Sequence, residues 1–591
     1  MVPRSARFFT ASLVLLIAAI IAGVVLLNRK MVNDARLEKA GQPAASQATG
    51  RDGDDPSGGS LVSSIRGEPR TFNRHFSRDF TTESVTYLTQ ARLVRVNRQT
   101  LELEPALAER WTLADDGLTY TLRLRQGLKF SDGAPFSSAD VLFSFRAAYD
   151  ERWTSSIGDT LRVNGKPLQV TAPDADTVVV RFPAPFGPGV RILDNLPIYP
   201  QHLLQADLDR GTFAKAWGPT TPPEKIAGLG PFVLREYQPG TRLVFTRNPH
   251  YFGRDAAGRP LPYLEKVTLE IVPDGNAELL RLQAGQIDCV QSEVRAEDYA
   301  VLKQAEAQGR IRMYDLGPGL DADSLWLNLR ADAKIPAPRR AWLQHPELRR
   351  AIAEAVDRKH FSDAVFLGAA EPVFGPVSPA NKAWFDPTVP TPAFDRAKAE
   401  ARLAGIGLRK GPDGTLVDRT GSPARITLIT QKGNASLERG AAIIRDDVRA
   451  IGLVVDVVAL EVGALVERLE TGDFEAIYFR FLTTDLDPAM NLDFWLSSGA
   501  AHVWNRAQKR PATEWERRVD DLMTRQAALP DMAERRRLFG EVQRTFAEEM
   551  PILYFATPRV YVATSARVRN VAPSLLRPMV LWSADTLAVA K

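Results

Sequence analysis

The sequence predicts an α/β protein with two lobes, in which helices flank mixed β-sheets. Three observations support this fold class. The chain has 591 residues, which is too long for a single hydrophobic core. Residues 104–149 read as strands, a turn and a helix, whereas residues 425–482 read as three strands separated by two helices. Because parallel strands need a crossover connection, the second segment predicts a parallel, doubly wound sheet.

The N-terminal segment predicts a membrane anchor. Residues 8–27 are mostly apolar and long enough to cross a bilayer as a helix. Arg4 and Arg7 precede them, which favours an N-terminus in the cytoplasm. We expect an uncleaved anchor, with cleavage as a signal peptide as the alternative; both place the remaining chain outside the cytoplasm. Residues 31–60 contain no aromatic residue and predict a disordered linker.

Alternating and helical periods define the elements of the first half of the chain. Residues 61–67 read as a strand, and residues 120–125 alternate apolar with polar side chains. We expect Ser138 to cap the helix that follows, with Asp140 in its first turn. Proline-rich residues 183–223 predict a connection. A hairpin at 233–245 and a strand–helix–strand unit at 267–291 follow.

The second half predicts the sheet that carries the functional site. Residues 453–460 are nearly all apolar, which is typical of a strand covered on both faces. In doubly wound sheets, ligands bind beyond the carboxyl ends of the strands. Residues 483–488 leave the last strand and are therefore expected at the ligand pocket. Residues 515–547 predict long helices with Arg535, Arg536 and Arg537 on a solvated face, and a strand at 550–555 returns to the first lobe.

Composition and charge exclude several classes of function. The net charge of +4 belongs to residues 1–30, which hold four basic residues and no acidic one, so no basic face for nucleic acid is predicted. The single cysteine, Cys289, lies in an apolar run and predicts a buried structural thiol. The six histidines are far apart, and no P-loop, HExxH or GxSxG motif is present. We therefore predict no catalytic residue, no metal site and no cofactor.

Residues 107–145, "LAERWTLADDGLTYTLRLRQGLKFSDGAPFSSADVLFSF", resemble the signature region of the family 5 extracellular solute-binding proteins. Residues 228–253 resemble a second family segment, with Leu229 where threonine is usual. The resemblance implies a two-lobe periplasmic-binding-protein-like fold of type II, in the large cluster that has an extra inserted subdomain. It implies lobe I at 60–95, 222–317 and 506–591, an inserted subdomain at 96–221, and lobe II at 318–505.

Candidate ligand-binding residues follow from the sheet and from the resemblance. Asp485 is expected to pair with the α-ammonium of a peptide, with Asp487 as the second choice, and a loop aspartate that caps a turn is the alternative. Arg480 is expected either to meet a ligand carboxylate or to pair with a neighbouring acid. Further candidates, for which core packing or an ordinary loop is the alternative, are Tyr478, Trp326, Asn328, Trp504, Phe80, Thr81 and Thr82.

The resemblance implies a monomeric, extracytoplasmic binding protein that is not an enzyme. It would capture oligopeptides or similar small solutes between its lobes and deliver them to the permease subunits of an ABC importer. Two alternatives remain at this point. A sensory receptor of the same fold would pass closure to a signalling partner, and an anchored hydrolase would use a carboxylate pair such as Asp485 and Asp487.

Overall fold

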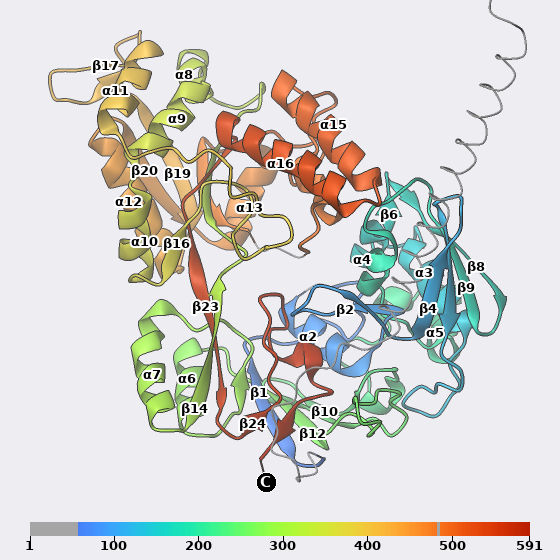
Figure 1. Cartoon of the computed structure of the whole chain (residues 1–591). Coiled ribbons are helices and arrows are strands. Elements are labelled where there is room, and N and C mark those ends of the chain that lie inside the picture. The colour runs from blue at the N-terminus through green and yellow to red at the C-terminus, as the bar shows by residue number, and fades with distance from the viewer. Residues whose placement is uncertain (1–56, 78, 482–484, 591) are drawn as a thin grey trace, which may run out of the picture.

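The computed structural model describes residues 57–77, 79–481 and 485–590 of an α/β protein built around several sheets (Figure 1). This confirms the predicted fold class. The expected anchor at 8–27 and nearly all of the expected linker lie outside the described residues. Among the helices that are described, none is both long and apolar enough to cross a membrane.

The first large sheet has eight strands, in the order β10-β11-β12-β1-β13-β23-β14, with β16 paired to β23. Strand β1 lies between β12 and β13 and is parallel to both. The predicted crossover at 267–291 is confirmed, although β1 is inserted between its two strands. The bounds are β1 Ser60–Ile65, β10 Phe232–Gln238, β11 Arg242–Arg247, β12 Lys266–Ile271, β13 Cys289–Val290, β14 Ile311–Pro318, β16 Ala370–Pro372 and β23 Ala556–Ser565.

Helices cover both faces of this sheet. On one face, α6 (Gly275–Gln283) and α7 (Tyr299–Ala307) pack Leu282 and Leu302 against the strands. On the other face, α2 (Phe80–Thr89) contributes Val85 and Leu88 to a larger core. Cys289 is buried in that core, and burial raises the pKa of its thiol to about 12, as expected for a structural thiol.

A separate four-stranded sheet, in the order β4-β5-β9-β8, packs with helix α3 within residues 96–221. We propose that this unit is the inserted subdomain. The helix spans Ser138–Tyr149, and its N-cap is Ser137 rather than the expected Ser138. Asp140 lies three residues after Ser137 and completes a capping box, because its side chain accepts the Ser137 backbone N–H. The strands are β4 Ala108–Leu113, β5 Thr119–Leu124, β8 Gln169–Asp174 and β9 Thr177–Arg181.

The second large sheet has the order β20-β19-β21-β15-β22. Strands β19, β20 and β21 are parallel, as predicted, whereas β15 is antiparallel to both β21 and β22. The expectation that residues 453–460 are covered on both faces is wrong. Strand β20 is an edge strand, and Val458 is exposed. The bounds are β15 Asp323–Leu327, β19 Arg425–Gln431, β20 Val454–Leu460, β21 Ala476–Arg480 and β22 Ile552–Tyr554.

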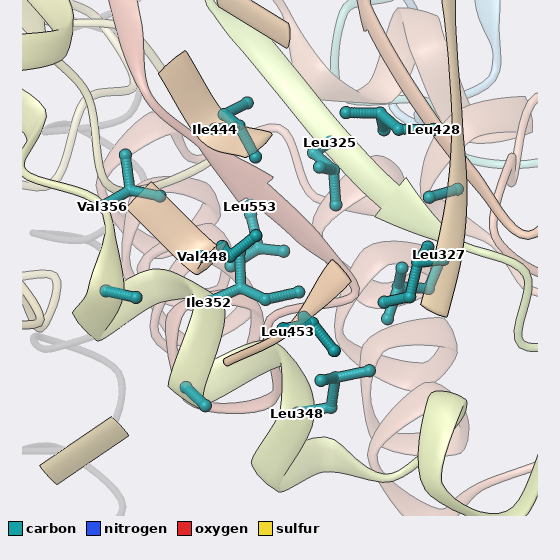
Figure 2. Close-up of a cluster of buried hydrophobic side chains, with 14 of the residues drawn as sticks. Leu325, Leu327, Leu348, Ile352, Val356, Leu428, Ile444, Val448, Leu453 and Leu553 are labelled. Carbon is teal, nitrogen blue, oxygen red and sulfur yellow. The ribbon is translucent and has the colours of Figure 1, made fainter. Parts of the chain in front are cut away.

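One face of the second sheet is covered by four helices, α9 (Pro346–Ala355), α10 (Arg358–Phe366), α11 (Arg396–Gly405) and α12 (Ala435–Arg449). Leucine, isoleucine and valine side chains from these helices and from the strands form a continuous core (Figure 2). Residues labelled there are Leu325, Leu327, Leu348, Ile352, Val356, Leu428, Ile444, Val448, Leu453 and Leu553. Burial of this apolar surface is the main force that holds the sheet to its helices.

The opposite face is covered by α13 (Val462–Thr471), α15 (Glu514–Ala528) and α16 (Met532–Glu549). The expected solvated position of Arg535 on α16 is wrong, because only 1% of its side chain is exposed. The reason is a long-range partner, the carboxylate of Asp487. Figure 1 shows α15 and α16 beside the second sheet. Although we expected residues 506–591 in lobe I, we propose that 514–555 belong to lobe II.

Two neighbouring chain segments join the large sheets. One runs from β14 to β15, and the other runs from β22 to β23 through Phe555. The Gly319 N–H donates to the Pro558 carbonyl over 2.8 Å, and the Thr557 hydroxyl donates to the Gly319 carbonyl over 3.0 Å. These bonds tie the two segments together where they pass between the sheets.

Candidate functional site between the lobes

Asp485 lies in the segment between β21 and the 3₁₀ helix at Pro488–Asn491. Its side chain faces Arg191 of the inserted subdomain. Its Oδ1 atom lies 3.5 Å from Arg191 Nε and accepts the Asp487 backbone N–H over 2.9 Å. The Asn491 side-chain amide donates to the Asp485 carbonyl over 3.1 Å. Burial raises the pKa of the Asp485 carboxyl, and the positive charge of Arg191 opposes that rise. With 23% of its side chain exposed, Asp485 is open to a cation that arrives from solvent.

Asp487 has different surroundings. Its carboxylate forms a bidentate ion pair with Arg535, in which Nη1 donates to Oδ2 over 2.9 Å and Nη2 donates to Oδ1 over 2.5 Å. Oδ1 also accepts the Ala489 N–H and caps the short 3₁₀ helix η5, Pro488–Asn491. The residue is buried, and both carboxylate oxygens are occupied. These contacts give Asp487 a structural role in the segment.

The first-lobe side of this contact is the 3₁₀ helix η1, Gly189–Asn195, in the inserted subdomain. It carries both Arg191 and Asp194. The carboxylate of Asp194 accepts the Val96 N–H over 3.3 Å and lies 4.0 Å from Arg92 Nε. Arg92 in turn donates to Glu83 of α2 over 3.4 Å. Arg92 therefore links α2 to η1, the 3₁₀ helix that also carries Arg191.

Arg480 and Tyr478 share one face of β21 and both bind Asp323. The Arg480 Nε–H donates to Asp323 Oδ1 over 2.6 Å, and the Tyr478 hydroxyl donates to Oδ2 over 2.5 Å. The Arg480 guanidinium also lies 5.2 Å from the centre of the Phe366 ring. Burial, and then the charge of Asp323, raise the pKa of Tyr478 well above its usual value. Of the two roles expected for Arg480, pairing with a neighbouring acid is present here.

Phe80, Thr81 and Thr82 form the first turn of α2, which Asp79 caps. The two threonine hydroxyls donate to backbone carbonyls of the preceding loop and are buried. Phe80 is half-buried.

The Phe80 ring lies beside an arginine from the C-terminal part of the chain. The Arg577 guanidinium lies 5.9 Å from the centre of the Phe80 ring, and Arg577 Nη2 lies 3.5 Å from Glu293 Oε1. Burial lowers the pKa of Arg480, but the charge of Asp323, with a small contribution from Glu293, raises it overall.

The remaining candidates lie in the core of the second sheet. Trp326 is fully buried and stacks on Phe481 with a centroid separation of 4.9 Å. The side-chain amide of Asn328 donates to the carbonyls of Gly472 and Phe474, over 2.9 Å in each case. Trp504 is fully buried against His502. A ligand-binding role for Trp326, Asn328 and Trp504 stays a prediction, and these contacts give each a packing role.

The sequence did not point to Arg191 or Arg535 as partners of Asp485 and Asp487. Arg191 lies in the proline-rich segment 183–223, for which only a connection was predicted, and its partner is far away in the sequence. Surface hollows lined by residues such as Leu142 and Tyr149, or Glu347 and Arg402, lie elsewhere and include none of the predicted ligand-binding residues. Among the residues that the structure describes, no three histidine, cysteine or acidic side chains form a group that could hold a metal ion.

Comparison with known proteins gives a consistent result. Residues 102–502 match the sequence profile described as bacterial extracellular solute-binding proteins, family 5 Middle. A probable ABC transporter-binding protein of Deinococcus radiodurans is 26% identical over 550 residues, which cover 89% of this chain and 91% of that protein. The oligopeptide-binding protein AppA of Bacillus subtilis, solved in complex with a nonapeptide, is 26% identical with a TM-score of 0.69 and covers 90% of this chain and 99% of its own.

The same fold carries other ligands. MelB of Agrobacterium fabrum, solved in complex with stachyose, has a TM-score of 0.73 at 22% identity and covers 90% of this chain and 85% of its own. That likeness shows the fold alone.

Proposed function

Because the chain belongs to family 5 of the bacterial extracellular solute-binding proteins, we propose that it captures short peptides outside the cytoplasm and delivers them to the membrane permease of an ABC importer. The observation that carries this proposal is the match to AppA, which spans almost the whole length of both chains and includes a bound peptide. The family consists of substrate-binding proteins of transporters rather than enzymes.

The ligand would bind between the lobes, with its α-ammonium at Asp485. In a site with few waters, a carboxylate and an ammonium form a strong charge-assisted hydrogen bond that fixes one end of a peptide. The partial exposure of Asp485, and its position in a segment that leaves a parallel strand, support this assignment. Arg480, already paired with Asp323, would border the ligand without carrying its main charge contact.

Capture and release would depend on bending at the two segments that join the sheets. Periplasmic binding proteins close around ligands by hinge motion of this kind. In this proposal, the protein acts as a monomer, and the apolar segment at 8–27 keeps it near the permease. Both features are consistent with delivery of a ligand to a membrane partner.

Native mass spectrometry of the gently purified full-length protein tests the ligand class. We expect a heterogeneous set of bound masses that fragment as short peptides. The Asp485→Asn variant, purified in the same way, should carry much less peptide. A single sugar or a metal complex in the wild-type protein would contradict the peptide proposal, although the family membership would stand.

A further inference from the structure

We propose that Arg535 is a positioning residue for ligand binding, and that it orients the Asp485 carboxylate by way of Asp487. This inference rests on the proposed function, because it assigns Asp485 to the ligand. Arg535 itself lies on α16, behind the segment, and its guanidinium contacts Asp487 rather than Asp485. It therefore acts through other groups of the protein.

The first step is the ion pair between Arg535 and Asp487. Both side chains are at least nine-tenths buried, with exposed fractions of 1% and 9%. The planar guanidinium engages both carboxylate oxygens at once, a geometry that fixes direction as well as distance. Buried ion pairs are often no more stabilising than well-packed apolar residues, so stability alone is a weak reason for this one.

The second step leads from Asp487 to Asp485. The backbone N–H of Asp487 donates to Asp485 Oδ1 over 2.9 Å. A shift of the Asp487 side chain therefore moves the donor that orients the Asp485 carboxylate. The Arg191 guanidinium is 3.5 Å away and makes no hydrogen bond to Asp485, so it constrains the carboxylate less.

The third step concerns what holds Arg535 itself. Its Nε–H donates to the Gln526 carbonyl over 3.0 Å, and its Nη2 donates to Gln526 Oε1 over 3.2 Å. The guanidinium lies 4.9 Å from the centre of the Trp384 ring. On the subdomain side, Gly187 approaches so closely that an added Cβ would lie 2.8 Å from Arg535 Nε. Arg535 is thus fixed between α15, α16 and the inserted subdomain.

The test compares the full-length wild-type protein with Arg535→Lys. Lysine keeps the positive charge but cannot engage both carboxylate oxygens in one plane. A library of synthetic tri- to pentapeptides is first screened against the wild-type protein, and the tightest member becomes the probe. We expect Arg535→Lys to weaken its affinity about tenfold, in line with the loss of a charge-assisted hydrogen bond. In an Asp485→Asn background, the same substitution should have almost no further effect.

Arg349→Lys is the matched control. Arg349 on α9 is also buried. Its guanidinium donates to the carbonyls of Glu549 and Gln344, and neither residue belongs to the ligand segment. We expect this variant to lose thermal stability and to keep the affinity of the wild type. Equal affinities for Arg535→Lys and wild type, or equal losses with and without Asp485, would overturn the positioning role.

Hydrogen exchange without ligand separates this inference from the proposed function. In Arg535→Lys, the backbone amides of Asp487 and Ala489 should exchange faster, because both donate to carboxylates of the segment. Arg349→Lys should leave them unchanged. If no peptide binds the wild-type protein, the proposed function fails, whereas unchanged exchange in Arg535→Lys contradicts the positioning role on its own.

Discussion

At the scale of residues, Asp485 and Asp487 show how surroundings separate two identical side chains. Asp487 is buried, and Arg535 and a backbone N–H occupy its oxygens. Among the described residues, none forms such a bidentate pair with Asp485, and burial disfavours its charge. A carboxylate whose ionised form is destabilised by burial in the free protein is stabilised when an ammonium group binds beside it.

Asp485→Asn should lower peptide affinity and raise stability. We expect affinity at pH 7 to fall about tenfold or more, which matches the loss of one hydrogen bond to a charged group. Because the folded-state pKa of Asp485 is raised, ionisation of its carboxyl destabilises the folded protein. This loss of stability increases as the pH rises from the ordinary pKa of aspartate to the raised pKa, and it is complete above the raised pKa. The variant should therefore unfold at a higher temperature than the wild type at pH 7, and the difference should vanish at low pH.

Calorimetric titrations between pH 4 and 8 check the ligand side of this prediction. Wild-type affinity should decrease as the pH is lowered through the pKa of Asp485, whereas the affinity of Asp485→Asn should stay nearly constant. A variant with wild-type affinity across this range would exclude Asp485 as the ammonium partner.

Asp323→Ala should destabilise the second sheet by about 3 kcal/mol, because it leaves the partly buried Arg480 guanidinium and the buried Tyr478 hydroxyl without their shared acceptor. Urea unfolding measures this loss. Asp456→Ala is the control on β20, since the Asp456 ion pair with Arg425 is exposed and should be worth less than about 1 kcal/mol. Similar losses for the two variants would contradict the assigned role of Asp323.

At the scale of elements, the approach of α12 to β21 depends on a glycine. An added Cβ at Gly440 would lie 2.1 Å from the Tyr478 hydroxyl oxygen. Alanine usually stabilises a helix relative to glycine, but here it must displace Tyr478 from Asp323. We expect Gly440→Ala to lower the free energy of unfolding by about 1–3 kcal/mol.

Gly463→Ala on the exposed part of α13 provides the comparison. Nothing lies within 4 Å of an added Cβ at Gly463, so alanine should be neutral or stabilising by up to about 1 kcal/mol. Denaturant melts of both variants measure the difference. If Gly440→Ala proved as stable as Gly463→Ala, the close packing of α12 on β21 would be disproved.

The sequence predicted these elements well where local periodicity decides, and less well where a distant partner decides. The strands and helices of 425–482 follow from apolar spacing, and their parallel pairing follows from the crossover rule. The edge position of β20 could not be predicted in this way, because it depends on β15 pairing with β21 at the opposite end of the strand order. The run of arginines at 535–537 predicts exposure, and only the Asp487 carboxylate, 48 residues away, explains why Arg535 is buried.

The same limit applies to the candidate site. Asp485 was predicted from its place after a parallel strand, which is a property of the fold class. Trp326 and Trp504, which were also predicted as ligand-binding residues, are fully buried in the structure. Apolar and aromatic composition cannot distinguish the two faces of a strand that is covered on both sides.

At the scale of the whole molecule, the inserted subdomain contacts α15 through a loop that tolerates no side chain. The Gly187 N–H donates to the Ala527 carbonyl over 2.6 Å, and an added Cβ would lie 2.3 Å from the Leu529 carbonyl oxygen. Gly187→Ala should push the subdomain away from the second sheet. We expect a larger radius of gyration in X-ray scattering with saturating peptide, together with about tenfold weaker affinity.

Gly218→Ala, elsewhere in the first half of the chain, is the control for this experiment. An added Cβ there meets only an ordinary van der Waals contact at 3.5 Å, so scattering and affinity should match the wild type. Unchanged scattering and affinity for Gly187→Ala would show that this contact does not control the distance between subdomain and second sheet.

The late position of β23 in the chain has a consequence for synthesis. This strand pairs with β13, β14 and β16, and the adjoining β22 completes the second sheet. Neither large sheet can therefore form completely before residues 552–565 have been synthesised. Until that segment leaves the ribosome, β13, β14 and β15 present unpaired edges, which are the surfaces that chaperones protect from aggregation. A nascent chain arrested before residue 552 should therefore remain protease-sensitive in both sheets, whereas the inserted subdomain, complete by residue 221, should already resist cleavage.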